Sequence, residues 1–143
     1  MAAGLRSPRE RVVQTLWFEA IGLLLVAPAY AAVMDAPAGE SFVLIAALSL
    51  AVMVWAGLYN TVFDVVERHR TGRVASDRPH VLRTLHAIGL EASSVVVTWP
   101  LVWALTPLSW WGALAADLGL GLVYALYGYV FFWVFDRLRP VRG

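Results

Sequence analysis

Four long apolar stretches divide the chain, and polar or turn-forming residues separate them. They run over about residues 12–34, 42–63, 84–106 and 113–135. Each has about the 20 residues that a helix needs to cross the hydrocarbon core of a bilayer. Lipid cannot satisfy the backbone of an open strand, and these stretches are too uniformly apolar for alternating barrel strands. The pattern therefore predicts an all-α membrane protein with four transmembrane helices.

The composition agrees with this prediction and narrows the function. Hydrophobic residues make up 60% of the 143 residues and charged residues 15%, against roughly half and a quarter in soluble domains. The chain has no cysteine, which excludes disulfides and thiolate metal sites, and its three histidines lack metal-ligand spacing. No phosphate loop or catalytic triad pattern is present. We therefore expect a protein that is not an enzyme and that needs no cofactor or metal.

The positions of the arginines predict the orientation in the membrane. All eleven lie in the N-terminal segment, in residues 64–83 or in the C-terminal segment, and the turns at 35–41 and 107–112 hold none. By the positive-inside rule, both termini and the 64–83 segment are expected on the cytoplasmic side. A cleaved signal peptide ending near Ala31 is less favoured, because Glu19 lies where its apolar core would begin. The basic segment lacks interleaved aromatic residues, so nucleic-acid binding is not expected.

The chain matches itself without a gap at an offset of 72 residues. The matched pairs include Arg11 and Arg83, Glu19 and Glu91, Pro28 and Pro100, Trp55 and Tyr127, and Asp64 and Asp136. Chance would explain shared leucines and alanines at one offset, but not shared arginine, glutamate, proline and aspartate. The sequence therefore predicts two transmembrane pairs, residues 1–72 and 73–143. Both pairs should have the same orientation, with the symmetry axis along the membrane normal.

Two glutamates inside the apolar stretches are the leading candidates for chemistry. Glu19 lies eight residues beyond Arg11, or about 12 Å of helix rise, and Glu91 occupies the equivalent position in the second pair. A carboxyl group in apolar surroundings favours its neutral form, so it can hold either a proton or a cationic substrate. Such residues commonly mark transport pathways. The alternative is a structural pairing with an arginine, histidine or tyrosine of a neighbouring helix.

Other polar and aromatic residues extend this site. The candidate transport pathway consists of Glu19, Trp55, Tyr59, Asn60, Glu91, Tyr127 and Trp133. We expect Glu19 to be the working acid and Glu91 to support it, because only the first pair has a polar residue at the position of Asn60. The aromatic stripe 55–59–63 and its copy 127–131–135 either pack helices together or bind flat cations through cation–π contacts.

A polar network is expected at the cytoplasmic ends of the helices. It consists of Arg11, Asp64, Arg83, His86 and Asp136, and Asp64 is expected to pair with Arg11 or Arg83. Asp117 is a candidate for the outer exit of the pathway, or alternatively a solvated helix end. Pro28 and Pro100 each follow a glutamate by nine residues, and a proline inside a helix predicts a kink there.

These spaced residues resemble the motifs of the proteobacterial antimicrobial compound efflux family, which is built from two bacterial transmembrane pair domains. The positions of the family motif Arg-x-x-His-x-x-x-Phe-Glu correspond to Arg11, Gln14, Phe18 and Glu19, and again to Arg83, His86, Leu90 and Glu91. The motifs of the second and fourth helices are matched by Trp55, Tyr59, Asn60, Phe63 and Asp64, and by Tyr127, Phe131, Trp133 and Asp136.

The resemblance implies a proton-coupled multidrug antiporter of the bacterial inner membrane that acts as a homodimer. Its substrates would be cationic biocides such as chlorhexidine, or short-chain diamines, and Glu19 would be the coupling carboxylate. Five residues depart from the family pattern: Gln14 replaces a histidine, Ala56 and Phe132 replace asparagines, and Leu90 and Phe135 are milder changes. Because these changes make the site more apolar, we expect a shifted substrate range.

A second hypothesis stays open at the level of sequence. A small membrane protein that assembles or senses, and does not transport, could use the basic 65–83 loop to bind a partner protein or anionic lipid. The two hypotheses differ in whether a substrate moves protons across the membrane.

Overall fold

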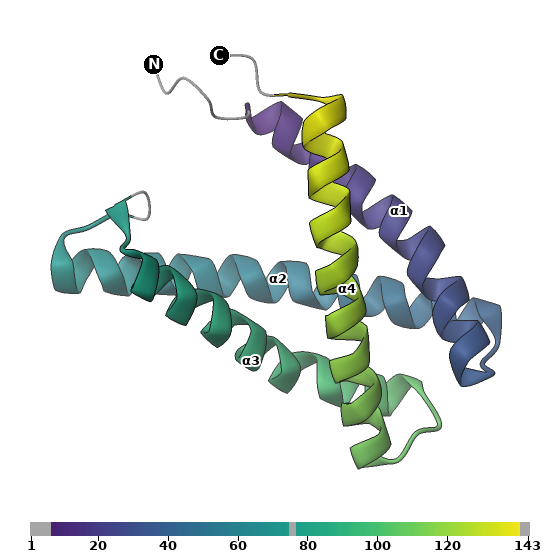
Figure 1. Ribbon diagram of the computed structural model, residues 1–143. Helices are drawn as coiled ribbons and strands as arrows, with labels where there is room; N and C mark the ends of the chain where they lie inside the picture. The colour runs from purple at the N-terminus through teal and green to yellow at the C-terminus, as the bar shows by residue number, and fades with distance from the viewer. Residues whose placement is uncertain (1–6, 75–76, 141–143) are drawn as a thin grey trace. The chain divides into compact units, whose positions relative to one another are not determined.

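The computed structural model describes residues 7–74 and 77–140, and Figure 1 shows its helices. They are α1 (Pro8–Met34), α2 (Ala38–Thr71), α3 (His80–Leu105) and α4 (Trp110–Leu138). All four are long and apolar enough to cross a membrane, which confirms the predicted all-α architecture. Arg6 and residues 141–143, which belong to the predicted basic ends, lie outside the described residues.

The helices begin and end beyond the predicted apolar stretches. Ser7 starts α1 with a capping box, in which its hydroxyl accepts from the Glu10 amide at 3.2 Å and the Glu10 carboxylate accepts from the Ser7 amide at 3.1 Å. These two bonds satisfy amides that have no partner inside the helix. The first helix therefore starts four residues earlier than hydropathy alone predicts.

The second helix extends furthest beyond the prediction. It continues past residue 63 to Thr71, with Arg68, His69 and Arg70 in its last turn, where cations interact favourably with the helix dipole. It ends at Gly72, whose positive φ of 71° suits glycine and whose amide bonds the Arg68 carbonyl at 2.9 Å. Much of the polar segment that separates the two repeats is therefore helical.

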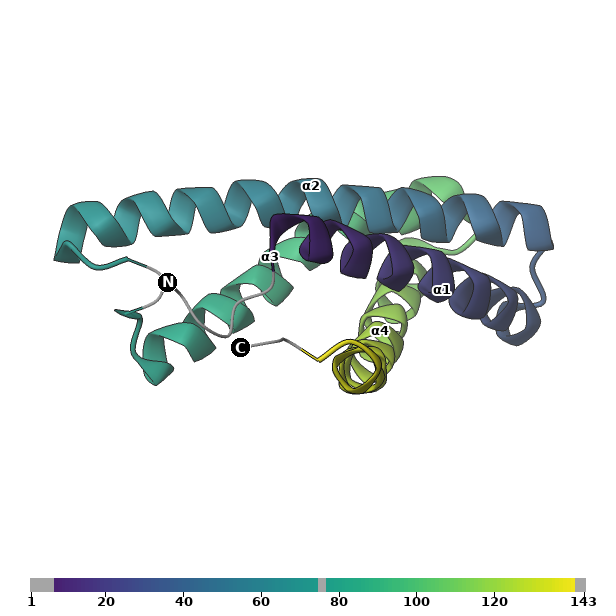
Figure 2. The same cartoon turned by 90° about the horizontal axis from the view of Figure 1, so that it is seen from above.

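The chain divides into two compact units that combine helices of different repeats. The first unit is Met1–Ala46 with Leu118–Gly143, and the second is Ala47–Asp117. The first unit joins α1 to most of α4, and the second joins α3 to most of α2. The 72–79 loop connects α2 to α3 (Figure 2). Each unit thus pairs the first helix of one repeat with the second helix of the other.

The first unit has a small interior, and much of its outer surface is apolar. Val26, Ala27 and Ile45 form its buried cluster, and Leu23, Leu120 and Tyr124 pack against it. Large apolar side chains remain exposed along the helices of both units, including Leu24 and Leu126 of the first unit and Val62 and Val96 of the second. Such a surface is what a lipid-facing protein presents. Both α1 and α3 continue past their prolines, and the kinks stay a prediction.

Candidate transport site

The residue before Glu19 fixes α1 against α4. The ring of Phe18 stacks on Tyr127, with centroids 5.0 Å apart, and on Phe132 at 5.4 Å, and it meets Phe131 edge-on at 5.3 Å. The Tyr127 hydroxyl donates a hydrogen bond to the Phe18 carbonyl at 2.7 Å. The side chains of one face of α4 therefore hold the backbone of α1 directly beside the candidate coupling acid.

A glycine allows this close approach of the two helices. Gly22 is buried, and a Cβ atom at this position would lie 3.0 Å from the Tyr127 ring. Any side chain there would push the ring away from α1. The small residue at position 22 is thus one condition for the hydrogen bond from Tyr127 to the Phe18 carbonyl.

Glu19 itself is half-buried on α1. It lies close enough to the Tyr127 phenol for the two groups to interact electrostatically. Within residues 7–74 and 77–140, the Glu19 carboxylate forms no hydrogen bond or ion pair. The Tyr127 hydroxyl bonds the neighbouring backbone carbonyl instead, which leaves the carboxylate available for a proton or a cation.

The second unit repeats this arrangement around Glu91 with one extra group. The indole of Trp55, the counterpart of Tyr127, donates to the Ser93 hydroxyl at 2.9 Å. Ser93 in turn donates to the carbonyl of Leu90 at 3.1 Å, and Leu90 is the residue before Glu91. An aromatic side chain thus reaches the carbonyl before the glutamate in both units, directly in one and through a serine in the other.

His86 packs as an aromatic partner of α2. Its ring centroid lies 5.2 Å from that of Tyr59 and 4.7 Å from that of Phe63, and the Tyr59 hydroxyl donates to the His86 carbonyl at 3.2 Å. The 55–59–63 stripe therefore joins α2 to α3, as the packing interpretation of the stripe expects. His86 Nε2 is buried and has no hydrogen-bond partner among the described residues.

Three predicted pathway residues lie on exposed faces of their helices. Asn60 and Glu91 are exposed, and so is Trp133, whose ring is covered on one side by the Arg137 guanidinium at 4.1 Å. The structure brings Glu19 to Tyr127, and it brings Trp55 and Tyr59 to α3.

The polar network contains an arginine that the sequence did not single out. Arg78 of the 72–79 loop donates to the carboxylates of Asp64 and Glu67, so Asp64 is bound by Arg78 and not by the expected Arg11 or Arg83. Arg83 donates to the Arg78 carbonyl at 2.9 Å. The hydrogen bond with Glu67 is the main cause that raises the pKa of Arg78 above its ordinary value. Arg11 and Asp136 are exposed.

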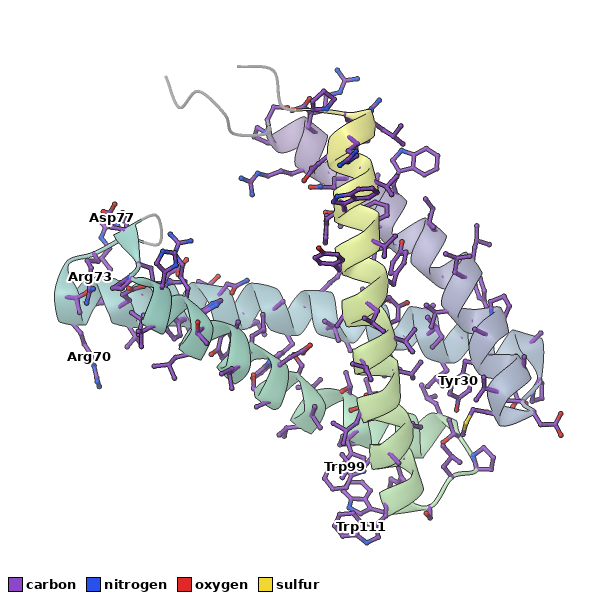
Figure 3. The ribbon with its side chains drawn as sticks, in the orientation of Figure 1. Tyr30, Arg70, Arg73, Asp77, Trp99 and Trp111 are labelled. Atoms are coloured by element: carbon purple, nitrogen blue, oxygen red, sulfur yellow. The ribbon has the colours of Figure 1, made fainter. Side chains whose placement is uncertain are left out.

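Asp117 is buried and not a solvated helix end. Only 7% of the residue is exposed, and its carboxylate accepts a hydrogen bond from the Thr98 hydroxyl at 2.8 Å. Thr98, Ser94 and Glu91 are spaced along one face of α3. Trp99 of α3 packs beside Trp111 in the first turn of α4, as Figure 3 shows. The buried carboxylate keeps Asp117 as a candidate for the outer part of a pathway.

The four apolar helices, which carry acidic groups within their spans, define a small multi-pass membrane protein. The family model described as a chlorhexidine efflux transporter matches residues 6–69 and, a second time, residues 78–141. The chain belongs to this family, which is the proteobacterial antimicrobial compound efflux family that its motifs resemble. The double match also confirms the two tandem transmembrane pairs.

Curated relatives with transport functions cover nearly the whole chain. A "Short-chain diamines transporter" of Acinetobacter baylyi is 29% identical over 136 residues, which are 94% of this chain and 93% of the relative. A protein of the same description from Vibrio parahaemolyticus is 25% identical over 131 residues, 92% of this chain and 91% of the relative. The family and these relatives are transporters and not enzymes. No solved structure gives a significant match.

Proposed function

We propose that this protein is a proton-coupled exporter in the bacterial inner membrane. Its substrates are cationic amphiphilic biocides or short-chain diamines, and both termini and the 64–83 segment face the cytoplasm. The double family match over both repeats is the observation that carries this proposal. The description of the curated relatives supports small diamines as one substrate class.

Glu19 is the group that couples the substrate to the proton. In the proposed cycle, its carboxyl group carries a proton when no substrate is bound. A cation that arrives from the cytoplasm or the inner leaflet takes the place of the proton: the O–H bond breaks, the proton passes to water on the cytoplasmic side, and the carboxylate pairs with the cation. The protein then opens outward, and a proton from outside displaces the cation and resets Glu19.

The surroundings of Glu19 support this role. The carboxylate has no ion-pair partner among the described residues, so a cation would not have to break an existing salt bridge there. The hydrogen bond from Tyr127 to the Phe18 carbonyl limits the movement of the backbone beside the acid. The rings of α4 around Phe18 offer apolar and cation–π contacts to an amphiphilic cation. Glu91 has the supporting role, and Asp117 belongs to the outer exit.

The active form is a homodimer. Asn60 and Glu91 are exposed on the single chain, and an exposed carboxylate is costly in hydrocarbon. A second copy can cover these polar groups. Native mass spectrometry of the protein released from nanodiscs measures the assembly, and a monomer in a preparation that transports substrate would contradict the dimer.

Reconstitution into proteoliposomes tests the proposed function. With an imposed pH gradient and a pH-sensitive dye, adding chlorhexidine or a short-chain diamine should cause proton movement that protein-free liposomes lack. If no compound in a panel of biocides and diamines moves protons, the transport proposal fails. The hypothesis of a protein that binds a partner or anionic lipid through residues 65–83 would then be favoured.

A further inference from the structure

Arg78 occupies an enclosed site formed by the last turns of α2. Only 8% of its side chain is exposed. Its Nε atom donates to Glu67 Oε2 at 2.7 Å, and its terminal nitrogen donates to Asp64. The guanidinium carbon lies 4.7 Å from the centre of the Phe63 ring. Two carboxylates and an aromatic face thus surround one cation.

This site has more acceptor capacity than Arg78 uses. The Glu67 side chain is only 4% exposed, yet its Oε1 atom is buried without a hydrogen-bond partner among the described residues. Leaving a buried acceptor unpaired is energetically unfavourable. The Glu67 carboxylate can therefore accept a hydrogen bond from a further donor.

The three residues that form the site come from one helix, whereas the cation comes from a loop. Phe63, Asp64 and Glu67 are spaced to lie on one face of α2. Arg78 belongs to the 72–79 loop that links α2 to α3. Because Arg78 lies outside α2, its side chain can rotate away from the two carboxylates without unfolding that helix, so the site can exchange its occupant.

We propose that Phe63, Asp64 and Glu67 form a binding site for primary ammonium or guanidinium groups, which Arg78 fills when no substrate is bound. A cationic substrate binds this site by displacing Arg78. The proposal rests on the proposed export function. Charge-assisted hydrogen bonds and a cation–π contact are the interactions that would select an alkylammonium group over a neutral molecule.

Competition by a tethered group makes a specific prediction. The apparent dissociation constant of a substrate rises with the fraction of time that Arg78 fills the site. If Arg78 fills the site for about nine-tenths of the time, removing it should strengthen substrate binding about tenfold. Removal of an arginine that merely anchors the loop would leave substrate binding unchanged or weaken it.

The test uses calorimetric titration of the purified full-length protein in nanodiscs with 1,5-diaminopentane. We expect Arg78→Gln to bind the diamine several-fold more tightly than the wild type, and this gain should disappear in the double variant Arg78→Gln/Glu67→Gln. Arg70→Gln is the matched control, because it also removes one arginine charge, in this case from the last turn of α2. Figure 3 shows the Arg70 side chain extending away from the loop, and this variant should bind like the wild type.

A folded Arg78→Gln variant with unchanged or weaker affinity would overturn the proposal. If that variant does not fold, Arg78→Lys decides, since lysine keeps the charge but lacks the forked geometry that reaches both acids. The lysine side chain should compete less for the site, so this variant should bind the diamine more tightly than the wild type does. Equal or weaker binding would again overturn the proposal. Absence of substrate-linked proton movement in the wild type would instead contradict the export function, so the two failures are distinguishable.

Discussion

Tyr127 donates a hydrogen bond to the carbonyl of Phe18, the residue directly before Glu19, across the contact between α4 and α1. The counterpart of Tyr127 in the other repeat, Trp55, reaches the carbonyl before Glu91 through the Ser93 hydroxyl. Both units thus hold the helix backbone next to the glutamate with an aromatic donor from a helix of the other repeat. The direct bond leaves less freedom beside Glu19 than the two-step link leaves beside Glu91.

Removing only the Tyr127 hydroxyl tests the importance of this bond. We expect Tyr127→Phe to destabilise the protein by about 1 kcal/mol and to slow substrate-driven proton movement, because the backbone beside Glu19 gains freedom. Thermal unfolding followed by tryptophan fluorescence and the proteoliposome assay measure the two effects. Tyr129→Phe is the control, since Tyr129 is 77% exposed. Equal results for the two variants would contradict the role of the Tyr127 bond.

The contact between α2 and α3 depends on the absence of a side chain at Gly89. A Cβ atom there would overlap the Tyr59 hydroxyl, which donates to the His86 carbonyl. We expect Gly89→Ala to displace Tyr59, break this bond and lower the free energy of unfolding by about 1–3 kcal/mol. A Cβ atom at Gly57 would meet no atom within 4 Å. The Gly57→Ala variant should therefore unfold at the same or a higher temperature, because alanine favours helix. A Gly89→Ala variant as stable as Gly57→Ala would rule out this packing.

The buried Asp117 depends on Thr98 for its hydrogen bond. We expect Thr98→Val to cost about 1–3 kcal/mol, since the carboxylate loses its donor. Thr61→Val is the control, because Thr61 is exposed and its hydroxyl donates to the Gly57 carbonyl of the same helix. Thermal unfolding of both variants in detergent measures the difference, and a loss no greater for Thr98→Val would contradict the account.

A double variant separates the structural from the transport role of Asp117. Thr98→Val/Asp117→Leu replaces both polar partners by apolar groups, which often restores stability. We expect it to be more stable than Thr98→Val alone but to transport poorly if Asp117 lies on the outer exit. Full transport by the double variant would show that Asp117 only holds α3 to α4.

The absence of native cysteine allows the orientation to be tested with single introduced cysteines. Asp77→Cys lies in the 72–79 loop, and Glu40→Cys lies in the first turn of α2 after the short turn. A membrane-impermeant maleimide should label Glu40→Cys from the outside of spheroplasts and Asp77→Cys only after the membrane is opened. The reverse labelling pattern would contradict the proposed placement of the termini and the 64–83 segment in the cytoplasm.

Hydropathy predicted the existence of the helices better than their ends. The apolar run of the second helix stops at Phe63, but the helix continues to Thr71. Hydropathy reports where the chain leaves lipid, whereas a helix ends where its backbone conformation changes, as at Gly72. The capping box at Ser7 and Glu10 was readable in the sequence as a serine followed three residues later by a glutamate.

Which helices contact one another, and which charged groups pair, was harder to predict from the sequence. The 72-residue offset shows which residues are equivalent but not which helices touch, so the pairing of α1 with α4 was not evident. Arg78 lies outside the family motifs, and its ion pairs depend on the path of the 72–79 loop. Ser93 has an apolar counterpart, Ile21, in the first repeat, so comparing the repeats gave no signal for its role.

The central claim is that Glu19 exchanges a proton for a cationic substrate. Glu19→Gln keeps the size of the side chain but removes its titratable group, and Glu91→Gln makes the same change at the equivalent position of the other repeat. In proteoliposomes with an imposed pH gradient, the account predicts that Glu19→Gln abolishes substrate-driven proton release while Glu91→Gln only reduces it. Both variants should insert and unfold like the wild type. Unchanged proton release by a folded Glu19→Gln variant would contradict the claim.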